Sequence, residues 1–115
     1  MASEKSTLSG NTSMLVLKLL DESDMYGYQI IEELAKRSEN VFRMKTGTIY
    51  PLLHSLEKDK LISSFDEKAD NLRLRKYYTL TRKGRGFLQK AQAEWREYSK
   101  AVSLIMEGGL YHATE

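Results

Sequence analysis

Residues 46–60, T-G-T-I-Y-P-L-L-H-S-L-E-K-D-K, decide the fold. Their apolar side chains recur at the spacing of one helical face, which predicts a half-buried helix with the stripe Ile49, Leu52, Leu53 and Leu56. At about 100° per residue, the opposite face carries the polar groups of Tyr50, His54 and Lys58, beside Gly47 and Pro51. Such a face can lie in the DNA major groove, although any solvated helix is also polar on its outer side.

The net charge of +2 hides an uneven distribution along the chain. Residues 43–90 hold 12 basic and 5 acidic side chains, a net charge of +7. The flanking segments are acidic, with −3 over residues 1–42 and −2 over residues 91–115. A local basic field around a helix of groove size is the electrostatic footprint of a protein that binds a polyanion.

Length and composition exclude several classes of protein. A chain of 115 residues forms one domain, and its modest core would gain stability from association with a second copy. The sequence has no cysteine, which excludes disulfides and thiolate sites, and its two histidines are too few for a histidine metal cluster. No apolar run approaches the roughly 18 residues of a membrane span, and no signal core is present. We therefore expect a cytoplasmic location and no membrane association.

Catalytic motifs do not occur in the sequence. It offers no Ser-His-acid set and no phosphate-cradling glycine loop, and His54 has no evident partner to tune it as an acid or base. We therefore expect no enzyme activity, no catalytic residues, no cofactor and no bound metal.

After residue 60 the apolar period changes from that of a helix to that of a strand. Residues 61–66 and 73–80 are predicted strands, and the turn-forming residues between them predict a β-hairpin. Arg73, Arg75 and Lys76 on the returning strand would face phosphates. Helices followed by a basic hairpin have the element order of a winged helix. The predicted fold class is therefore mainly α (α+β), a winged helix-turn-helix with a two-stranded wing.

Two helices are predicted before this region. Residues 1–10 are small and polar, so we expect a disordered N-terminal tail, followed by a helix over about residues 11–20. A second helix is predicted to end near Ser38, and residues 41–44 are predicted as one short strand.

The last predicted helix begins after Thr81, its cap, and extends to about Met106. Its apolar side chains follow alternating steps of three and four residues, typical of a heptad seam, through Leu88, Ala91, Trp95, Tyr98, Val102 and Ile105. At 1.5 Å per residue the helix is about 39 Å long, more than a small winged helix can cover. The seam predicts a long C-terminal dimerisation helix over residues 81–107, before a flexible tail over residues 108–115. The alternative is a helix packed wholly on its own domain.

Five motifs occur in order along the chain. They are Y-G-Y-Q-I at residues 26–30, G-T-I-Y-P-L-L at 47–53, L-E-K at 56–58, L-I at 61–62 and R-K-Y-Y-T-L-T at 75–81, and Gly84 and Trp95 agree with them. Over about residues 8–106 the chain resembles the PadR family of bacterial transcriptional regulators, in its short subfamily. The resemblance implies a winged-helix DNA-binding domain over residues 11–80 and a homodimer joined through the last helix. It also implies repression of a promoter, often relieved by a small aromatic or drug-like compound.

The predicted partner is a near-palindromic operator on double-stranded DNA. The candidate DNA-binding residues are Lys45, Thr46, Thr48, Tyr50, His54, Lys58, Arg73, Arg75 and Lys76. Two of the family's usual features are changed, because Lys45 stands where relatives often have a capping residue and Leu74 stands where they often have arginine or proline. The first change favours phosphate attraction over capping.

The candidate effector site is Ala91, Trp95 and Tyr98 in the middle of the seam. A two-fold axis would bring two tryptophans near each other, and small Ala91 beside large Trp95 leaves a gap in which a flat aromatic effector can stack. The alternative is that Trp95 simply fills the dimer core. An alternative function, a winged-helix protein-protein interaction module without effector or DNA specificity, would require an apolar or acidic recognition face, and the basic stretch argues against it.

Overall fold

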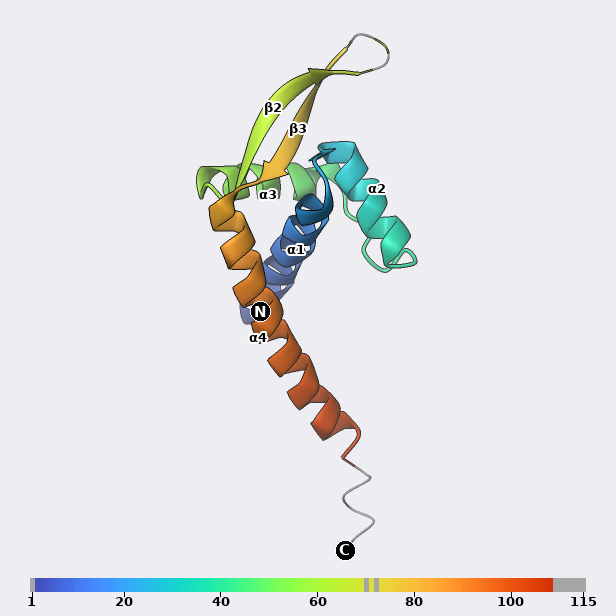
Figure 1. Cartoon of the computed structure of the whole chain (residues 1–115). Coiled ribbons are helices and arrows are strands. Elements are labelled where there is room, and N and C mark those ends of the chain that lie inside the picture. Colours follow the sequence, from blue (N-terminus) through green and yellow to red (C-terminus); the bar gives the residue numbers. More distant parts are fainter. Residues whose placement is uncertain (1, 70, 72, 109–115) are drawn as a thin grey trace, which may run out of the picture.

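The computed structural model describes residues 2–69, 71 and 73–108 and confirms the winged helix-turn-helix fold. The elements in chain order are α1 (Ala2–Glu22), β1 (Met25–Tyr26), α2 (Gly27–Arg37), α3 (Thr46–Lys58), β2 (Ile62–Lys68), β3 (Leu74–Leu80) and α4 (Arg82–Met106). Figure 1 shows the β2–β3 hairpin projecting from one end of the molecule and α4 from the opposite end, with α1, α2 and α3 between them.

The described strands form one antiparallel sheet in the order β1-β3-β2. The hairpin that the sequence predicted is present, and in the structure Ile62 pairs with Leu80 at its base. β1 was missed, because a strand of two residues has no period to detect. The strand predicted at residues 41–44 is wrong, since this segment is a loop in which the Val41 side chain is 74% exposed.

α1 is longer than predicted. It begins at Ala2, whereas the sequence suggested a disordered tail over residues 1–10 and a helix start near Asn11. Residues 2–10 contain no proline, and extending an existing helix adds one hydrogen bond for each residue fixed, so polar composition alone does not end it. The N-terminal boundary at residue 10 therefore does not match the structure.

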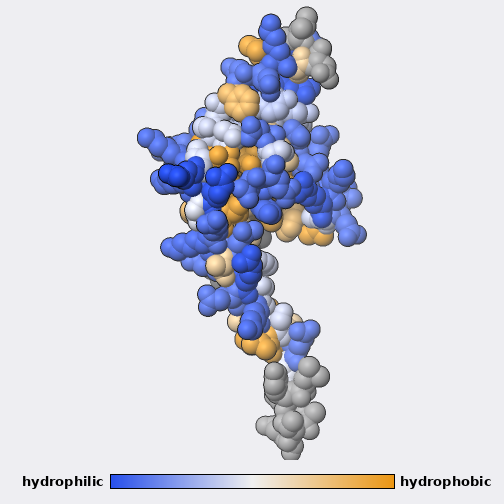
Figure 2. Space-filling model, in the orientation of Figure 1, coloured by the Kyte–Doolittle hydropathy of each residue, from blue (hydrophilic) through white to orange (hydrophobic). Residues whose placement is uncertain are grey.

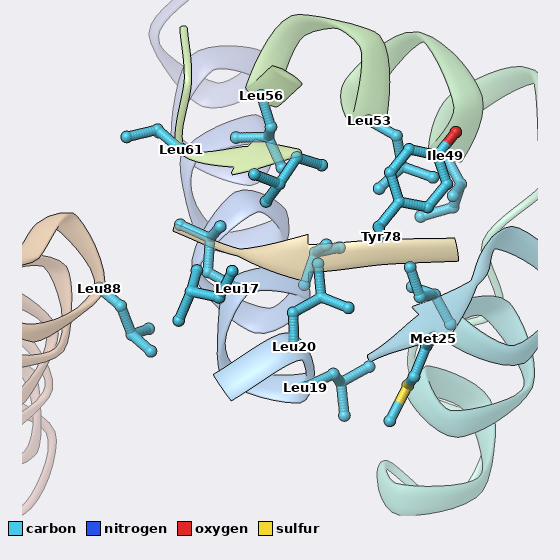
Figure 3. Packing of buried hydrophobic residues seen from close by; sticks show 14 of the residues in the cluster. Leu17, Leu19, Leu20, Met25, Ile49, Leu53, Leu56, Leu61, Tyr78 and Leu88 are labelled. Atoms are coloured by element: carbon cyan, nitrogen blue, oxygen red, sulfur yellow. The ribbon is translucent and has the colours of Figure 1, made fainter. Parts of the chain in front are cut away.

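One hydrophobic cluster joins α1, α2, α3, the sheet and the first turns of α4. Figure 3 shows Tyr78 reaching from β3 toward Ile49 and Leu53, which lie on the inner stripe of α3 as predicted. Tyr78 is 1% exposed, and this burial raises the pKa of its hydroxyl, with the nearby Glu57 carboxylate adding to the effect. α3 is thus held by its apolar face, which leaves its polar face outward.

The junction between the hairpin and α4 is built around Thr81. The Thr81 Oγ1 atom accepts a hydrogen bond from the Gly84 N–H at 3.0 Å, which confirms the predicted cap. The same hydroxyl faces the carbonyl oxygens of Lys60 and Leu61, at 2.7 and 2.9 Å. These contacts fix the first turn of α4 against the start of β2.

Within the described ranges, no helix combines the length and the apolar character that crossing a bilayer requires.

Candidate nucleic-acid interface

The outer face of α3 is exposed and carries no carboxylate in its first turn. Lys45 occupies the N-cap position without a side-chain cap, so the first N–H groups of α3 remain available to an anion. Thr46 and Thr48 are exposed beside it, and His54 and Lys58 are exposed further along the helix. The structure therefore places these predicted residues on one accessible face.

Tyr50 differs from the prediction that it lies fully on the outer face. It is half-buried, and its ring covers Gly27 at the start of α2 so closely that a Cβ atom there would lie 2.3 Å from the Tyr50 hydroxyl oxygen. The glycine permits this approach between α2 and α3. Burial raises the pKa of the Tyr50 hydroxyl, and the neighbouring Tyr28 raises it further, so the group remains a hydrogen-bond donor at neutral pH.

Aromatic rings cover one face of the sheet and hold Arg75. The Arg75 guanidinium carbon lies 4.3 Å from the centroid of the Tyr26 ring, a cation–π contact. Tyr26 meets Tyr77 edge to face with centroids 5.4 Å apart, and Tyr77 stacks on Phe65 at 5.7 Å. The ring contacts span β1, β3 and β2 and restrain a cation that would otherwise move freely.

Lys76 lies on the opposite face of the hairpin, because successive strand residues point to opposite sides. Its Nζ atom is 3.9 Å from the Glu57 carboxylate on α3, and Glu57 also accepts a hydrogen bond from the Ser64 hydroxyl at 2.5 Å. Glu57 thus links the recognition helix to both strands of the wing. The pairing partly neutralises the charge of Lys76. The sequence did not reveal this contact.

A cavity of about 660 Å³ lies between the start of α2, the outer face of α3 and β3. It brings together five residues that the sequence analysis selected and five that it missed: Tyr26, Gly27, Tyr28, Glu32, Tyr50, His54, Arg73, Arg75, Lys76 and Tyr78. The Y-G-Y motif at residues 26–28 was the available signal for three of the missed residues, but only the fold shows that it lies beside α3 and the wing. Lys45, Thr46, Thr48 and Lys58 do not line this cavity.

Among the described residues, no three or more histidine, cysteine, aspartate or glutamate side chains lie together so that they could hold a metal ion.

The seam of α4 divides into a buried and an exposed part. Leu88 is 2% exposed and points from α4 toward Leu17 on α1, so its assignment to dimerisation is wrong (Figure 3). The later seam residues are accessible, with Trp95 43% and Ile105 79% exposed. Figure 2 shows hydrophobic side chains at the distal end of α4, where exposed Leu104, Ile105 and Met106 gather. Adjoining exposed apolar side chains of this kind are typical of surfaces that contact a partner.

Two hollows flank Trp95 between α1 and α4. The larger, about 380 Å³, is lined by the three candidate effector residues together with Asn11, Met14, Phe87 and Glu94. The smaller, about 220 Å³, lies on the other side of Trp95 and is lined by Met14, Leu15, Lys18, Gln92 and Arg96. The Trp95 and Tyr98 ring centroids are 6.0 Å apart. The sequence predicted the α4 residues but missed the contribution of α1.

Comparison with known proteins gives consistent matches along the chain. Residues 16–90 match the model of the Transcriptional regulator PadR-like family. The chain is 34% identical to an uncharacterized protein of Lysinibacillus sphaericus, covering 88% of this chain and 93% of that one. It is 31% identical to the transcriptional regulator Rv3488 of Mycobacterium tuberculosis (strain ATCC 25618 / H37Rv), covering 70% and 72%. A PadR family transcriptional regulator from Eggerthella lenta DSM 2243 matches the fold with a TM-score of 0.75 and 31% identity, covering 92% and 91%.

Proposed function

Because this chain belongs to the PadR-like family of transcriptional regulators, we propose that it is a homodimeric repressor that binds a near-palindromic operator and releases it when a small aromatic effector binds. The family consists of transcriptional regulators, which are not enzymes. The observation that carries the proposal is the cavity at which Tyr50 and His54 of α3 meet the cations of the hairpin, beside the exposed polar face of the same helix. This arrangement fits a helix in the major groove with a wing on the flanking backbone.

Each candidate DNA contact has a role that follows from its position. His54 and Lys58 are exposed along α3 and would meet base edges in the groove, while Lys45, Thr46 and Thr48 would meet phosphates at the start of the helix. Tyr50 would contribute beside the start of α2, because its hydroxyl and ring lie over Gly27. Arg73, Arg75 and Lys76 would contact the backbone beside the wing.

The proposed dimer rests on the exposed part of the α4 seam, Trp95, Tyr98, Val102 and Ile105, with half-buried Ala91 at its edge. A partner helix would remove this apolar surface from water. Two winged helices joined in this way would place their recognition helices in successive major grooves, about 34 Å apart.

The wing assignment predicts a loss of affinity without a loss of sequence preference. Replacing both Arg75 and Lys76 by alanine should weaken binding to the operator and to unrelated duplexes alike, because phosphate contacts carry no sequence information. Each lost contact should lower the slope of log affinity against log salt concentration by roughly 0.9. Lys76→Ala alone should lower DNA affinity less than Arg75→Ala alone does, since Glu57 already pairs with Lys76. Fluorescence anisotropy over a range of salt concentrations measures both quantities.

Lys90→Ala is the matched control for this experiment. It removes one positive charge from an exposed position on α4 that does not line the cavity, so it tests for a general effect of net charge. Unchanged affinity and slope in the double variant would overturn the wing assignment.

The effector proposal predicts a ligand response at Trp95, the only tryptophan in the sequence. Planar aromatic cations or phenolic acids should quench its fluorescence to saturation, because they would stack in the hollow that Ala91, Trp95 and Tyr98 line. Binding should also lower operator affinity, since an effector shifts an equilibrium by its differential affinity for the two states.

The control for ligand binding is calorimetry with Trp95→Ala, which should no longer bind the compound. If no member of a broad panel binds, or if binding leaves operator affinity unchanged, Trp95 has only a packing role.

A further inference from the structure

The cavity at the start of α2 has an excess of positive charge, which comes from the hairpin and not from α3. Arg73, Arg75 and Lys76 line it from the hairpin, against one carboxylate, that of Glu32. Among the ion pairs of the described residues, Lys76 is matched with Glu57, whereas Arg73 and Arg75 appear in none. Two guanidinium groups therefore face this cavity without a carboxylate partner in the described structure.

α2 adds to the positive potential of the same cavity. The helix begins at Gly27, its N-cap residue Tyr26 makes no side-chain cap, and its first turn contains no acidic residue. The first N–H groups of a helix lack partners within it, and the helix dipole places partial positive charge there. Both Tyr26 and Gly27 line the cavity, so the N-terminus of α2 lies at its wall.

The remaining lining groups suit an anion with several oxygens. Arg75 is held over the Tyr26 ring, which fixes its guanidinium near the start of α2. Tyr50 has its hydroxyl over Gly27, and Tyr28 lines the rim with its side chain 60% exposed. Planar guanidinium groups, backbone N–H groups and hydroxyls are the donors that recognise phosphate.

We propose that this cavity is a phosphate seat, in which the start of α2, Arg73 and Arg75 hold one backbone phosphate of the DNA strand that passes between α3 and the wing. The proposal rests on the proposed DNA-binding function. It adds the Y-G-Y segment at residues 26–28 to the contact surface and assigns it one phosphodiester. A free phosphate ion presents the same chemistry, so the test separates the two sources.

The experiment uses the full chain, isotopically labelled for amide NMR, and a duplex obtained by selection of bound DNA fragments. With that duplex, the amide signals of Gly27 and Tyr28 should shift together with those of Thr48 and His54 on α3. Inorganic phosphate is the second probe and should leave the Gly27 and Tyr28 signals unmoved at concentrations where the duplex shifts them. Signals that respond to inorganic phosphate but not to the duplex would overturn the assignment to DNA.

Single methylphosphonate linkages placed in turn along the duplex locate the phosphate. One linkage in each half-site should weaken binding about tenfold, the loss expected for one charged hydrogen-bonded contact. The same linkage should have little further effect on Arg75→Ala, because that variant has already lost the contact, whereas Lys90→Ala should respond like the unsubstituted protein.

The outcomes distinguish failure of the seat from failure of DNA binding. If the α3 signals shift with DNA, but the Gly27 and Tyr28 signals do not and no linkage depends on Arg75, the seat is overturned and the proposed function stands. If no signal shifts with any selected duplex, the proposed function fails and the seat fails with it.

Discussion

Replacing Gly84 by alanine should destabilise the protein by about 2–3 kcal/mol, in the upper range for overpacking. Gly84 lies in the first turn of α4, and a Cβ atom added to it would be 2.0 Å from the Leu61 carbonyl oxygen and 2.7 Å from the Leu80 side chain. A backbone carbonyl cannot move aside as a flexible side chain can. α4 would have to shift away from the Leu61 carbonyl group, which would strain the Thr81 cap and the neighbouring core.

Gly86→Ala is a matched control two residues along the same helix. A Cβ atom at Gly86 would meet nothing within 4 Å, and alanine is favoured over glycine in a helix by about 1 kcal/mol. This variant should therefore be slightly more stable than the parent. Urea unfolding followed by circular dichroism measures both changes, and a shift of the midpoint at constant slope identifies a change in stability. Equal effects of the two substitutions would contradict the close packing of α4 on the Leu61 carbonyl group.

Sequence periodicity predicted the elements that are long and packed on one face. The buried stripe of α3, the hairpin and the Thr81 cap were all predicted, because a helix buries every third or fourth residue and a hairpin needs β-formers around a turn. The basic residues of β3 were also recognised. Their separation onto two faces of the hairpin follows from strand alternation, but their partners depend on which elements pack beside each face.

The features that sequence analysis missed depend on contacts between distant segments. No sequence pattern indicated the partners of Glu57, and only the fold shows that it contacts Ser64 and Lys76. Leu88 has the spacing of the α4 seam, yet it faces α1 because the first turns of α4 pack on the core. A period describes which side of a helix is apolar, whereas the tertiary arrangement decides whether the same chain or another chain covers that side.

The candidate interface shows the same division between local pattern and tertiary contact. Helical geometry predicted which residues of α3 are exposed, but the inward turn of Tyr50 depends on Gly27, which lies 23 positions earlier in the chain. The cavity that gathers α2, α3 and β3 could not be derived from any one of these segments. Local periodicity therefore predicted which face of α3 is exposed. The cavity beside that face, where a DNA phosphate is proposed to bind, could be recognised only in the structure.

Replacing Val102 and Ile105 together by glutamate should convert a dimer into monomers at micromolar concentration. Both side chains are exposed on the distal part of α4, where the seam has no cover from its own domain. Two carboxylates there would have to be desolvated in a packed helix pair, which is strongly unfavourable. Sedimentation velocity measures the change in mass, and a dimeric variant, or a monomeric unsubstituted protein, would overturn the proposed seam.

The same substitution should lower operator affinity by about 10²–10⁴-fold, because two linked half-site contacts gain from effective concentration and a monomer does not. Binding to a single half-site should change little, since α3 and the wing lie at the opposite end of the molecule from the distal part of α4 (Figure 1). Ala93→Glu combined with Ser103→Glu adds the same two negative charges to exposed positions outside the seam and should leave both mass and affinity nearly unchanged. If the seam variant loses affinity for the operator and the half-site equally, the loss reflects charge or unfolding, and the contribution of dimerisation to operator binding is refuted. If only the operator is affected, the exposed seam of α4 is the element that converts two weak half-site contacts into one tight complex.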